Sequence, residues 1–252
     1  MGEKSNDLSV CDFDRICSIP LVEAEANTSM DERDYLFVGH YFCCLYSLFI
    51  NPIWMVRRKF KMLFHKNLSL LGWEEVKRRQ LHRLLLVKEW IELVKVKKGE
   101  HLLDVGPGPG VFTLKYAEAI GPTGKVTALE KSHEAIEHLL QNFSRTSHNL
   151  IVKQGDAETF DLGSLGHIDV VMLTDILHHA DSPEGVLRNL RKLHSTRFLI
   201  SEFDPRSNGG FGPPLDKRLS EETVLEMLLC NGYTVTARGE QIFEHYYIIA
   251  NT

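Results

Sequence analysis

The chain has 252 residues, of which 43% are hydrophobic and 25% are charged, a composition typical of a globular protein with a sizeable core. Its formal net charge of -5 provides no overall attraction to nucleic acid, so no nucleic-acid partner is expected. The five cysteines are odd in number and form no C-x-x-C pair, which excludes a zinc framework and a secreted disulfide scaffold and favours a cytoplasmic location.

Two segments precede the main domain. Residues 1–30 are polar and show no periodicity, so we expect a flexible tail. Residues 31–70 are different: residues 36–50 are mostly apolar or aromatic, and basic residues then alternate with aromatic ones up to residue 66. No Asp or Glu occurs between residues 35 and 73.

Three interpretations of residues 31–70 are open. A transmembrane helix needs about 20 apolar residues, and Asn51-Pro52 interrupts this apolar run too early. Peripheral membrane contact through residues 36–66 would use the aromatic side chains together with the basic ones, which attract anionic head groups. In the third interpretation the segment is a helical cap that buries its aromatic side chains against the main domain.

The predicted main domain covers residues 71–252 and begins with a helix. Leu84, Val87, Ile91 and Val94 recur at intervals of three and four, the period of an amphipathic helix, so we expect one helix over residues 73–94. It should pack beside the first strand.

A glycine-rich turn follows that strand. Residues 101–105 form a short apolar run, and Gly106, Gly108 and Gly110 then lead into the next helix. Glycines let the backbone approach a ligand closely and offer its N–H groups. Asp104, at the end of the strand, suits a cationic ligand, and the G-x-G-x-G spacing differs from the G-x-G-x-x-G of dinucleotide-binding turns.

Further carboxylates follow the next three predicted strands. Residues 125–129 lead to Glu130, which is placed to accept two hydrogen bonds from ribose hydroxyls, and the third and fourth strands end at Asp156 and Asp175. Because ligands bind beyond the carboxyl ends of parallel strands, we expect these side chains and Asp104 to surround one ligand. For each of them the alternative is an exposed carboxylate that caps the following helix.

The rest of the chain alternates helices with strands and ends in a hairpin. We expect helices over residues 183–193 and 220–230, a strand over 197–203, a glycine- and proline-rich loop over 204–216, and final strands over 233–238 and 241–250 with Gly239-Glu240 between them. This order predicts an α/β fold, a doubly wound Rossmann-like seven-stranded sheet that is mostly parallel with one antiparallel strand, plus an N-terminal helical segment.

From about residue 87 onwards the chain resembles the class I S-adenosylmethionine-dependent methyltransferases, within them the ubiquinone/menaquinone-biosynthesis-like small-molecule group. The motifs that carry the resemblance are the D-x-G-x-G-x-G turn, the acidic residue after strand two, G-D-A at residues 155–157 and L-H-H at residues 177–179. The resemblance implies S-adenosylmethionine as cofactor, with Asp104 and Asp175 toward its methionine end and Glu130 on its ribose. It also implies that Asp156 binds the adenine amino group and that the Ala157 N–H binds a ring nitrogen.

Two histidines after strand four are the candidate catalytic residues. A sulfonium methyl is already activated, so positioning supplies much of the catalysis and neither a protein nucleophile nor a metal is required. A base is needed only where the acceptor must lose a proton, and His178 and His179 are the candidates for that role. The alternative is that one packs in the cleft and the other is exposed. With Asp181 they match no metal-ligand spacing, so no metal site is expected.

The expected function is methyl transfer to a small-molecule or lipid-like acceptor. One alternative is a non-catalytic module that keeps the cofactor site for regulation or assembly. The other is an NAD-linked oxidoreductase, against which the glycine spacing and the terminal hairpin both count. The acceptor atom and the oligomeric state are open. The wall of the acceptor site is expected from residues 203–216, including Phe203, Asp204, Phe211 and Asp216, and from the N-terminal aromatic segment.

Overall fold

The computed structural model describes residues 70–143 and 149–252. The predicted tail and, apart from Leu70, the predicted cap or membrane-contacting segment lie outside these residues. Within the two described ranges, no helix combines the length and the apolar character that a membrane span requires.

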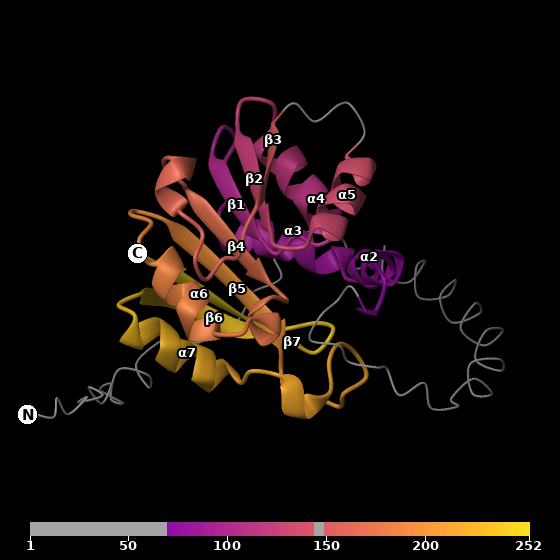
Figure 1. Cartoon of the computed structure of the whole chain (residues 1–252). Helices are drawn as coiled ribbons and strands as arrows, with labels where there is room; N and C mark the ends of the chain where they lie inside the picture. The colour runs from indigo at the N-terminus through magenta and orange to yellow at the C-terminus, as the bar shows by residue number, and fades with distance from the viewer. Residues whose placement is uncertain (1–69, 144–148) are drawn as a thin grey trace, which may run out of the picture. The chain divides into compact units, whose positions relative to one another are not determined.

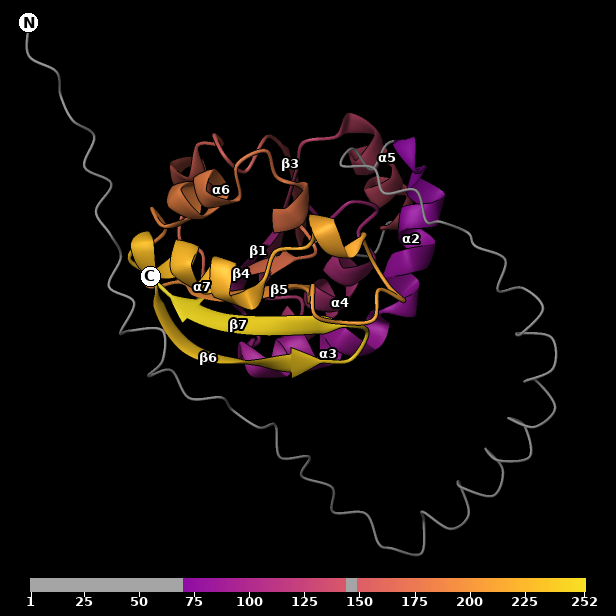
Figure 2. The same cartoon turned by 90° about the horizontal axis from the view of Figure 1, so that it is seen from below.

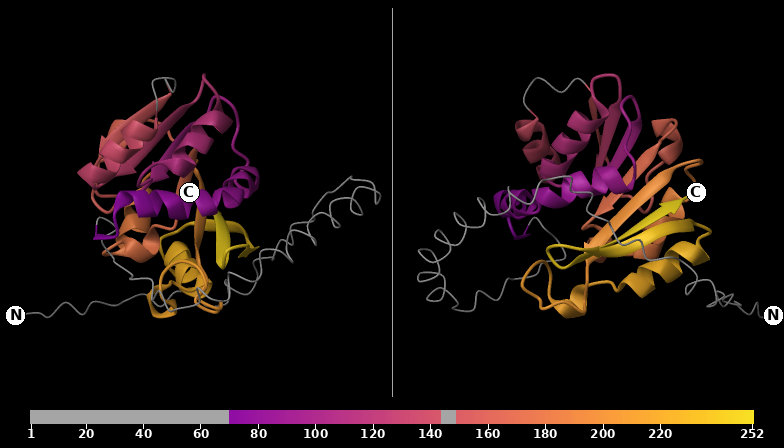
Figure 3. Two further views of the ribbon diagram at one scale, coloured as in Figure 1. Left: turned by 90° about the vertical axis from the view of Figure 1, so that its right-hand side faces the viewer. Right: turned by 180° about the vertical axis from the view of Figure 1, so that it is seen from behind.

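Seven strands form one sheet in the order β3-β2-β1-β4-β5-β7-β6 (Figure 1). Only β7 runs against its neighbours: it pairs antiparallel with both β5 and β6, and the other pairs are parallel. The predicted fold class is therefore confirmed. The hairpin of β6 and β7 lies at the opposite end of the sheet from β3 (Figure 3). The strands are β1 His101–Val105, β2 Lys125–Glu130, β3 Leu150–Gln154, β4 Val170–Thr174, β5 Arg197–Phe203, β6 Thr234–Gln241 and β7 His245–Asn251.

Helices cover both faces of the sheet, and each face has its own apolar core (Figure 2). Because successive side chains of a strand point to opposite faces, Leu102 packs with α3 and α4, whereas Leu103 and Val105 pack with α6 and α7. The described helices are α2 Trp73–His82, α3 Leu84–Leu93, α4 Val111–Ile120, α5 His133–Asn142, α6 Pro183–Leu190 and α7 Glu221–Cys230.

The single helix predicted over residues 73–94 is wrong: the chain forms two helices that meet at Arg83. Arg83 is the C-cap of α2 and the N-cap of α3, and its side chain forms an ion pair with Asp175 beyond β4. The apolar periodicity of residues 73–94 gives no sign of this break.

The predicted hairpin turn at Gly239-Glu240 is also wrong. Gly239 lies inside β6, opposite Tyr247, and a Cβ on it would come within 2.8 Å of the Tyr247 ring. The turn is formed by Ile242, Phe243 and Glu244, and the last two have positive φ values although neither is glycine. Two predicted element ends are also wrong. β3 ends at Gln154 and not at Asp156, and α6 ends at Leu190 and not at residue 193.

Candidate functional site

All three glycines of the turn after β1 adopt the left-handed conformation that favours glycine, with φ values of 67°, 56° and 79° for Gly106, Gly108 and Gly110. Packing also accounts for two of them. A Cβ on Gly106 would lie 2.3 Å from the side chain of Ile176, and one on Gly110 would lie 2.8 Å from Leu139. Gly108 has more room, and its N–H donates a hydrogen bond to Glu130 at 3.0 Å.

Helix α2 closes one side of this turn. The Gln80 amide donates to the Pro107 carbonyl at 3.0 Å and accepts from the Val111 N–H at 3.2 Å. On the neighbouring helix α5, Asn142 donates to the Pro109 carbonyl and accepts from Lys77 of α2. The glycine turn is therefore held in one conformation by side chains of α2 and α5.

Glu130 lies at the end of β2 with its carboxylate buried against the turn. Its two oxygens accept backbone hydrogen bonds from Gly108 at 3.0 Å and from Ser132 at 2.9 Å. Burial raises the pKa of Glu130, and the Ser132 and Gly108 N–H groups oppose that rise. A carboxylate has about four acceptor positions, so lone pairs remain for the two ribose hydroxyls expected there.

Asp104 is the second buried carboxylate of the carboxyl edge, with only 2% of the residue exposed. It accepts a hydrogen bond from the Thr113 hydroxyl at 2.6 Å, and no basic side chain among the described residues forms an ion pair with it. Burial raises the pKa of Asp104 to about 7, the Thr113 hydroxyl opposes the rise and the nearby Glu130 charge adds to it. A cationic ligand would supply the counter-charge that this carboxylate lacks.

Asp175 follows β4 in the left-handed conformation, with φ 58°, and is held by two basic side chains. Arg83 lies 2.9 Å from one carboxylate oxygen, and Nε2 of His245 lies 2.7 Å from the other. Burial opposes ionisation, but Arg83 and His245 outweigh it and hold the pKa of Asp175 well below its usual range. Asp175, which was predicted to lie at the cofactor's methionine end, is therefore already in contact with two basic side chains of the protein.

The His245 ring lies between two hydrogen-bond acceptors. Its Nδ1 lies 2.8 Å from the Phe243 carbonyl oxygen, which can only accept, and its Nε2 faces the ionised Asp175 carboxylate, which also only accepts. The ring is buried at the start of β7.

The two predicted catalytic histidines lie in the short 3₁₀ helix that follows β4, Leu177–His179. Nδ1 of His178 lies 2.6 Å from Oε2 of Glu202, and the side chains of both residues are at least 98% buried. Glu202 also accepts from the Leu177 N–H at 2.7 Å. The His179 ring stands over His178, with 4.1 Å between ring centroids.

The residues predicted for adenine lie after β3. Asp156 has a side chain that is 40% exposed and accepts from the Glu158 N–H at 2.9 Å. The Ala157 carbonyl accepts from the Asn189 amide. Asp156 thus also organises the following turn, as the capping alternative expects, and its contact with adenine stays a prediction.

Three side chains of the carboxyl edge were missed in the sequence analysis: Arg83, Glu202 and His245. Glu202 was detectable, because it stands near the end of a predicted strand as Glu130 does. Arg83 and His245 show no such sign in the sequence. Arg83 lies at the break between α2 and α3, and His245 begins the antiparallel strand β7.

Buried hydrogen-bond donors and carboxylates both lie at this edge. Nε of Arg83 is buried without a hydrogen-bond partner among the described residues, and the Tyr116 hydroxyl is buried beside Thr174. Burial, together with the charges of Asp104 and Asp175, raises the pKa of Tyr116 well above its usual value. Donors and carboxylates that converge beside the glycine turn fit the carboxylate and ammonium groups of a methionine moiety. Among residues 70–143 and 149–252, no three His, Cys, Asp or Glu side chains cluster as metal ligands.

The expected wall of the acceptor site is anchored by Arg218. Its buried guanidinium forms an ion pair with Glu244 at 2.9 Å and lies over the Phe203 ring, 5.3 Å from its centroid. Phe203 is buried, whereas Phe211 is 44% exposed and packs edge-on against Phe243. Apolar and cationic groups therefore meet at this side of the carboxyl edge.

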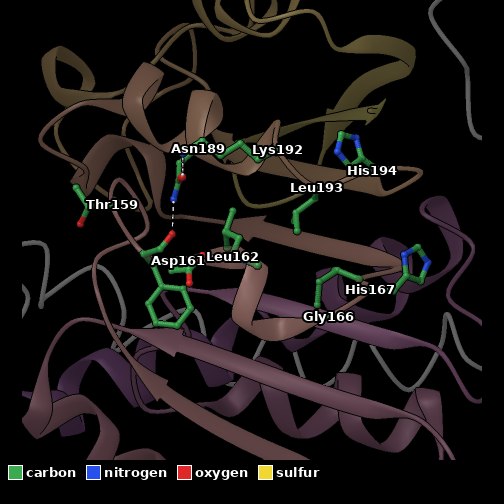
Figure 4. Close-up of a pocket in the computed structure, with 12 residues that line it drawn as sticks. Thr159, Asp161, Leu162, Gly166, His167, Asn189, Lys192, Leu193 and His194 are labelled. Carbon is green, nitrogen blue, oxygen red and sulfur yellow. Dashed lines mark hydrogen bonds between the residues drawn. The ribbon is translucent and has the colours of Figure 1, made fainter.

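A cavity of about 640 Å³ lies elsewhere, among the segments that precede β4 and β5 (Figure 4). Its lining includes His167, Lys192 and His194, and the Asn189 amide on its wall donates to the Phe160 carbonyl at 3.0 Å. Because these segments enter the amino ends of the parallel strands, this cavity is separate from the carboxyl edge.

The comparisons with known proteins agree with this geometry. A protein-family model described as a methyltransferase domain matches residues 96–247. The chain is 32% identical over 136 residues to the ubiquinone/menaquinone biosynthesis C-methyltransferase UbiE of Ectopseudomonas mendocina, which covers 51% of each chain. It is also 36% identical over 66 residues to the 23S rRNA (uracil(1939)-C(5))-methyltransferase RlmD of Acinetobacter baylyi. That match covers 26% of this chain and 14% of RlmD.

The chain thus spans about half the length of UbiE and a smaller part of RlmD. A solved structure of a SAM-dependent methyltransferase from Aquifex aeolicus has the same fold, with a TM-score of 0.59 at 19% identity over 65% of this chain and 88% of that chain.

Proposed function

This chain belongs to the methyltransferase-domain family, and from that membership we propose that it transfers the methyl group of S-adenosylmethionine to a small-molecule or lipid-like acceptor. The observation that carries the proposal is the pair of buried carboxylates, Asp104 and Glu130, beside the left-handed glycine turn. S-adenosylmethionine supplies a methyl group on a positively charged sulfur, which a nucleophile displaces in line.

Each part of the cofactor has residues that suit it. Asp104 and the Tyr116 hydroxyl would take the methionine end, with Asp175 behind them, and the Gly106–Gly110 backbone would pass beside it. Glu130 would accept from the ribose hydroxyls. Asp156 and the Ala157 N–H would bind adenine. The chain's contribution is to hold the donor and acceptor in line in a buried place, which is where proximity lowers the barrier most.

Small molecules are favoured over RNA as acceptors. The chain has a net charge of -5, whereas RNA-binding domains are usually basic. The rim residue Phe211 offers an aromatic surface instead.

Peripheral membrane contact through residues 36–66 would suit a lipid-like acceptor and rests on the sequence alone. It is tested by sedimentation with anionic vesicles at low and high salt, where absence of salt-sensitive binding argues against it.

The function is tested by incubating the protein with methyl-labelled S-adenosylmethionine and a cell extract divided into small-molecule, lipid and RNA fractions. We expect label in the small-molecule or lipid fraction. Label in the RNA fraction alone would show that the acceptor is RNA and not a small molecule or a lipid. Cofactor binding without label in any fraction would favour the non-catalytic module.

Glu130→Gln should weaken S-adenosylmethionine binding about 10- to 100-fold, because glutamine has one acceptor oxygen for two backbone donors and two hydroxyls. Isothermal calorimetry measures the affinity. Glu137→Gln on α5 is the control, since that side chain is 61% exposed and pairs only across the helix surface. Equal affinities for the two variants would contradict the assignment of Glu130 to the ribose.

A further inference from the structure

The short turn after β3 carries the two groups that are proposed to bind adenine. The Thr159 and Phe160 N–H groups donate to the Asp156 carbonyl, at 3.0 and 2.8 Å. The Glu158 N–H donates to the Asp156 carboxylate at 2.9 Å. Among the residues that the structure describes, the Ala157 N–H has no hydrogen-bond partner. The turn therefore places a carboxylate beside a backbone donor that a ligand can use.

The carbonyls of this turn are held by one side-chain amide of α6. Nδ2 of Asn189 donates to the Ala157 carbonyl and to the Phe160 carbonyl, at 3.0 Å each. Oδ1 of Asn189 accepts from the Lys192 ammonium at 2.9 Å. An ammonium only donates and a carbonyl only accepts, so these partners fix the orientation of the amide. Both amide hydrogens of Asn189 are thus used on the turn.

The cavity of about 640 Å³ lies beside these hydrogen bonds. Phe160 and Asn189 both line it (Figure 4), and Asn189 itself is buried, with 5% of the residue exposed. Ala157 and Phe160 are partly buried against the core, and the Glu158 carboxylate accepts from the exposed Ser182 N–H at 2.8 Å. Atoms that face a cavity have no van der Waals partners on that side. The amide of Asn189 therefore contributes a large share of what fixes the turn.

We propose that Asn189 is a positioning residue that makes the cofactor site selective for adenine over purine bases without its amino group. This inference rests on the proposed binding of S-adenosylmethionine. Asp156 would accept from the adenine amino group and the Ala157 N–H would donate to a ring nitrogen. Asn189 does not touch the base: it holds the turn so that both groups meet the base at once.

The chemistry of the carboxylate explains the selectivity. An ionised carboxylate only accepts hydrogen bonds, and the adenine amino group can donate to it. Hypoxanthine has an oxygen in place of that amino group, and this oxygen would face the Asp156 carboxylate without a proton between them. The rejection of hypoxanthine requires that the turn hold the carboxylate close to the base, and a turn that shifts would reject it less.

Two substitutions remove the amide donors in different ways. Asn189→Asp keeps the shape and places a carboxylate oxygen against the two carbonyl oxygens of the turn. Asn189→Leu keeps a similar volume without a charge, and it serves if Asn189→Asp does not fold. Leu190→Ala is the matched control. Leu190 is the next residue of α6 and is fully buried, so its truncation lowers stability and leaves the side-chain hydrogen bonds of the turn in place.

Calorimetry compares S-adenosylhomocysteine with S-inosylhomocysteine, which differ only in the base. We expect the wild type to bind the adenosyl compound about 10- to 100-fold more tightly. Each Asn189 variant should lose about tenfold in affinity for the adenosyl compound and less than about twofold for the inosyl compound. Leu190→Ala should keep the wild-type preference, although urea denaturation shows it to be less stable. Circular dichroism confirms that each variant is folded.

A folded Asn189 variant that keeps the wild-type preference would overturn the inference and leave the proposed function standing. Equal binding of the two compounds by the wild type, or the same loss of preference in Leu190→Ala, would also overturn it. Absence of S-adenosylmethionine binding by the wild type would overturn the proposed function itself, and the inference with it.

Discussion

Replacing Asp104 with asparagine should stabilise the cofactor-free protein at about pH 8 while weakening its binding of S-adenosylmethionine. The carboxyl group is buried without an ion-pair partner among the described residues, and its pKa is raised from 3.8 to about 7. The folded state therefore binds more protons than the unfolded state between those values, and the free energy of unfolding falls as pH rises through that window. Three units correspond to a cost on the order of 4 kcal/mol above about pH 7.

Asparagine removes the charge and keeps the shape, so we expect a gain of about 2 kcal/mol at about pH 8 after the cost of burying its amide, and no gain at about pH 4. Urea denaturation at both pH values measures it. Asp181→Asn is the control, since that side chain is 73% exposed. A loss of stability in Asp104→Asn at both pH values would contradict the account of this carboxylate.

The same carboxylate predicts that cofactor binding is coupled to proton release. A cationic ligand stabilises the ionised form, so S-adenosylmethionine should bind more tightly as pH rises through about 7. Calorimetry in two buffers with different ionisation enthalpies measures the protons released below that pH. Affinity and heat that are independent of pH and buffer would show that Asp104 does not face the cofactor's charge.

Replacing Arg83 with methionine should lower the free energy of unfolding by about 3 to 4 kcal/mol. The side chains of Arg83 and Asp175 are 12% and 11% exposed, and loss of one partner leaves a buried carboxylate with His245 alone. The Arg83 guanidinium lies over the Phe203 and Phe112 rings, and methionine offers an uncharged side chain to the same rings. Urea denaturation measures the change.

Arg78→Met is the matched control, in helix α2, which Arg83 caps. Arg78 is 55% exposed and pairs with Glu75 at 2.7 Å, so its loss should cost no more than about 1 kcal/mol. Adding Asp175→Asn to Arg83→Met should recover part of the loss, and asparagine tolerates the left-handed backbone there. Equal losses in the two arginine variants would contradict the role of the buried pair.

The strands β1, β2, β4 and β5 were predictable because each is a short and mostly apolar run that is followed by turn residues. The runs before Asp104 and Glu130 read as buried strands, and strand alternation with helices then implies a parallel sheet. That places those carboxylates at a common edge, as the structure has them. The presence of the terminal hairpin was predictable, but the position of its turn was not. Gly239 is needed inside β6 because a side chain there would collide with the Tyr247 ring, and the turn includes Phe243 and Glu244, which do not look like turn residues in the sequence.

The second half of the site depends on contacts between distant residues. Arg83 contacts Asp175 across 92 positions of sequence, and His178 contacts Glu202 across 24. Local patterns identify such residues as ordinary helix or strand positions. The motifs therefore identified the glycine turn and the carboxylates of the edge, whereas the groups around His178 became visible only in the folded structure.

The central claim is that the carboxyl edge binds S-adenosylmethionine, and calorimetry tests it most directly. Titration of the purified chain with S-adenosylmethionine should give one saturable binding event per chain, which Glu130→Gln weakens and Glu137→Gln does not, while NAD gives no binding heat. Binding of NAD, or no binding of S-adenosylmethionine at any pH at which the protein is folded, would contradict the account.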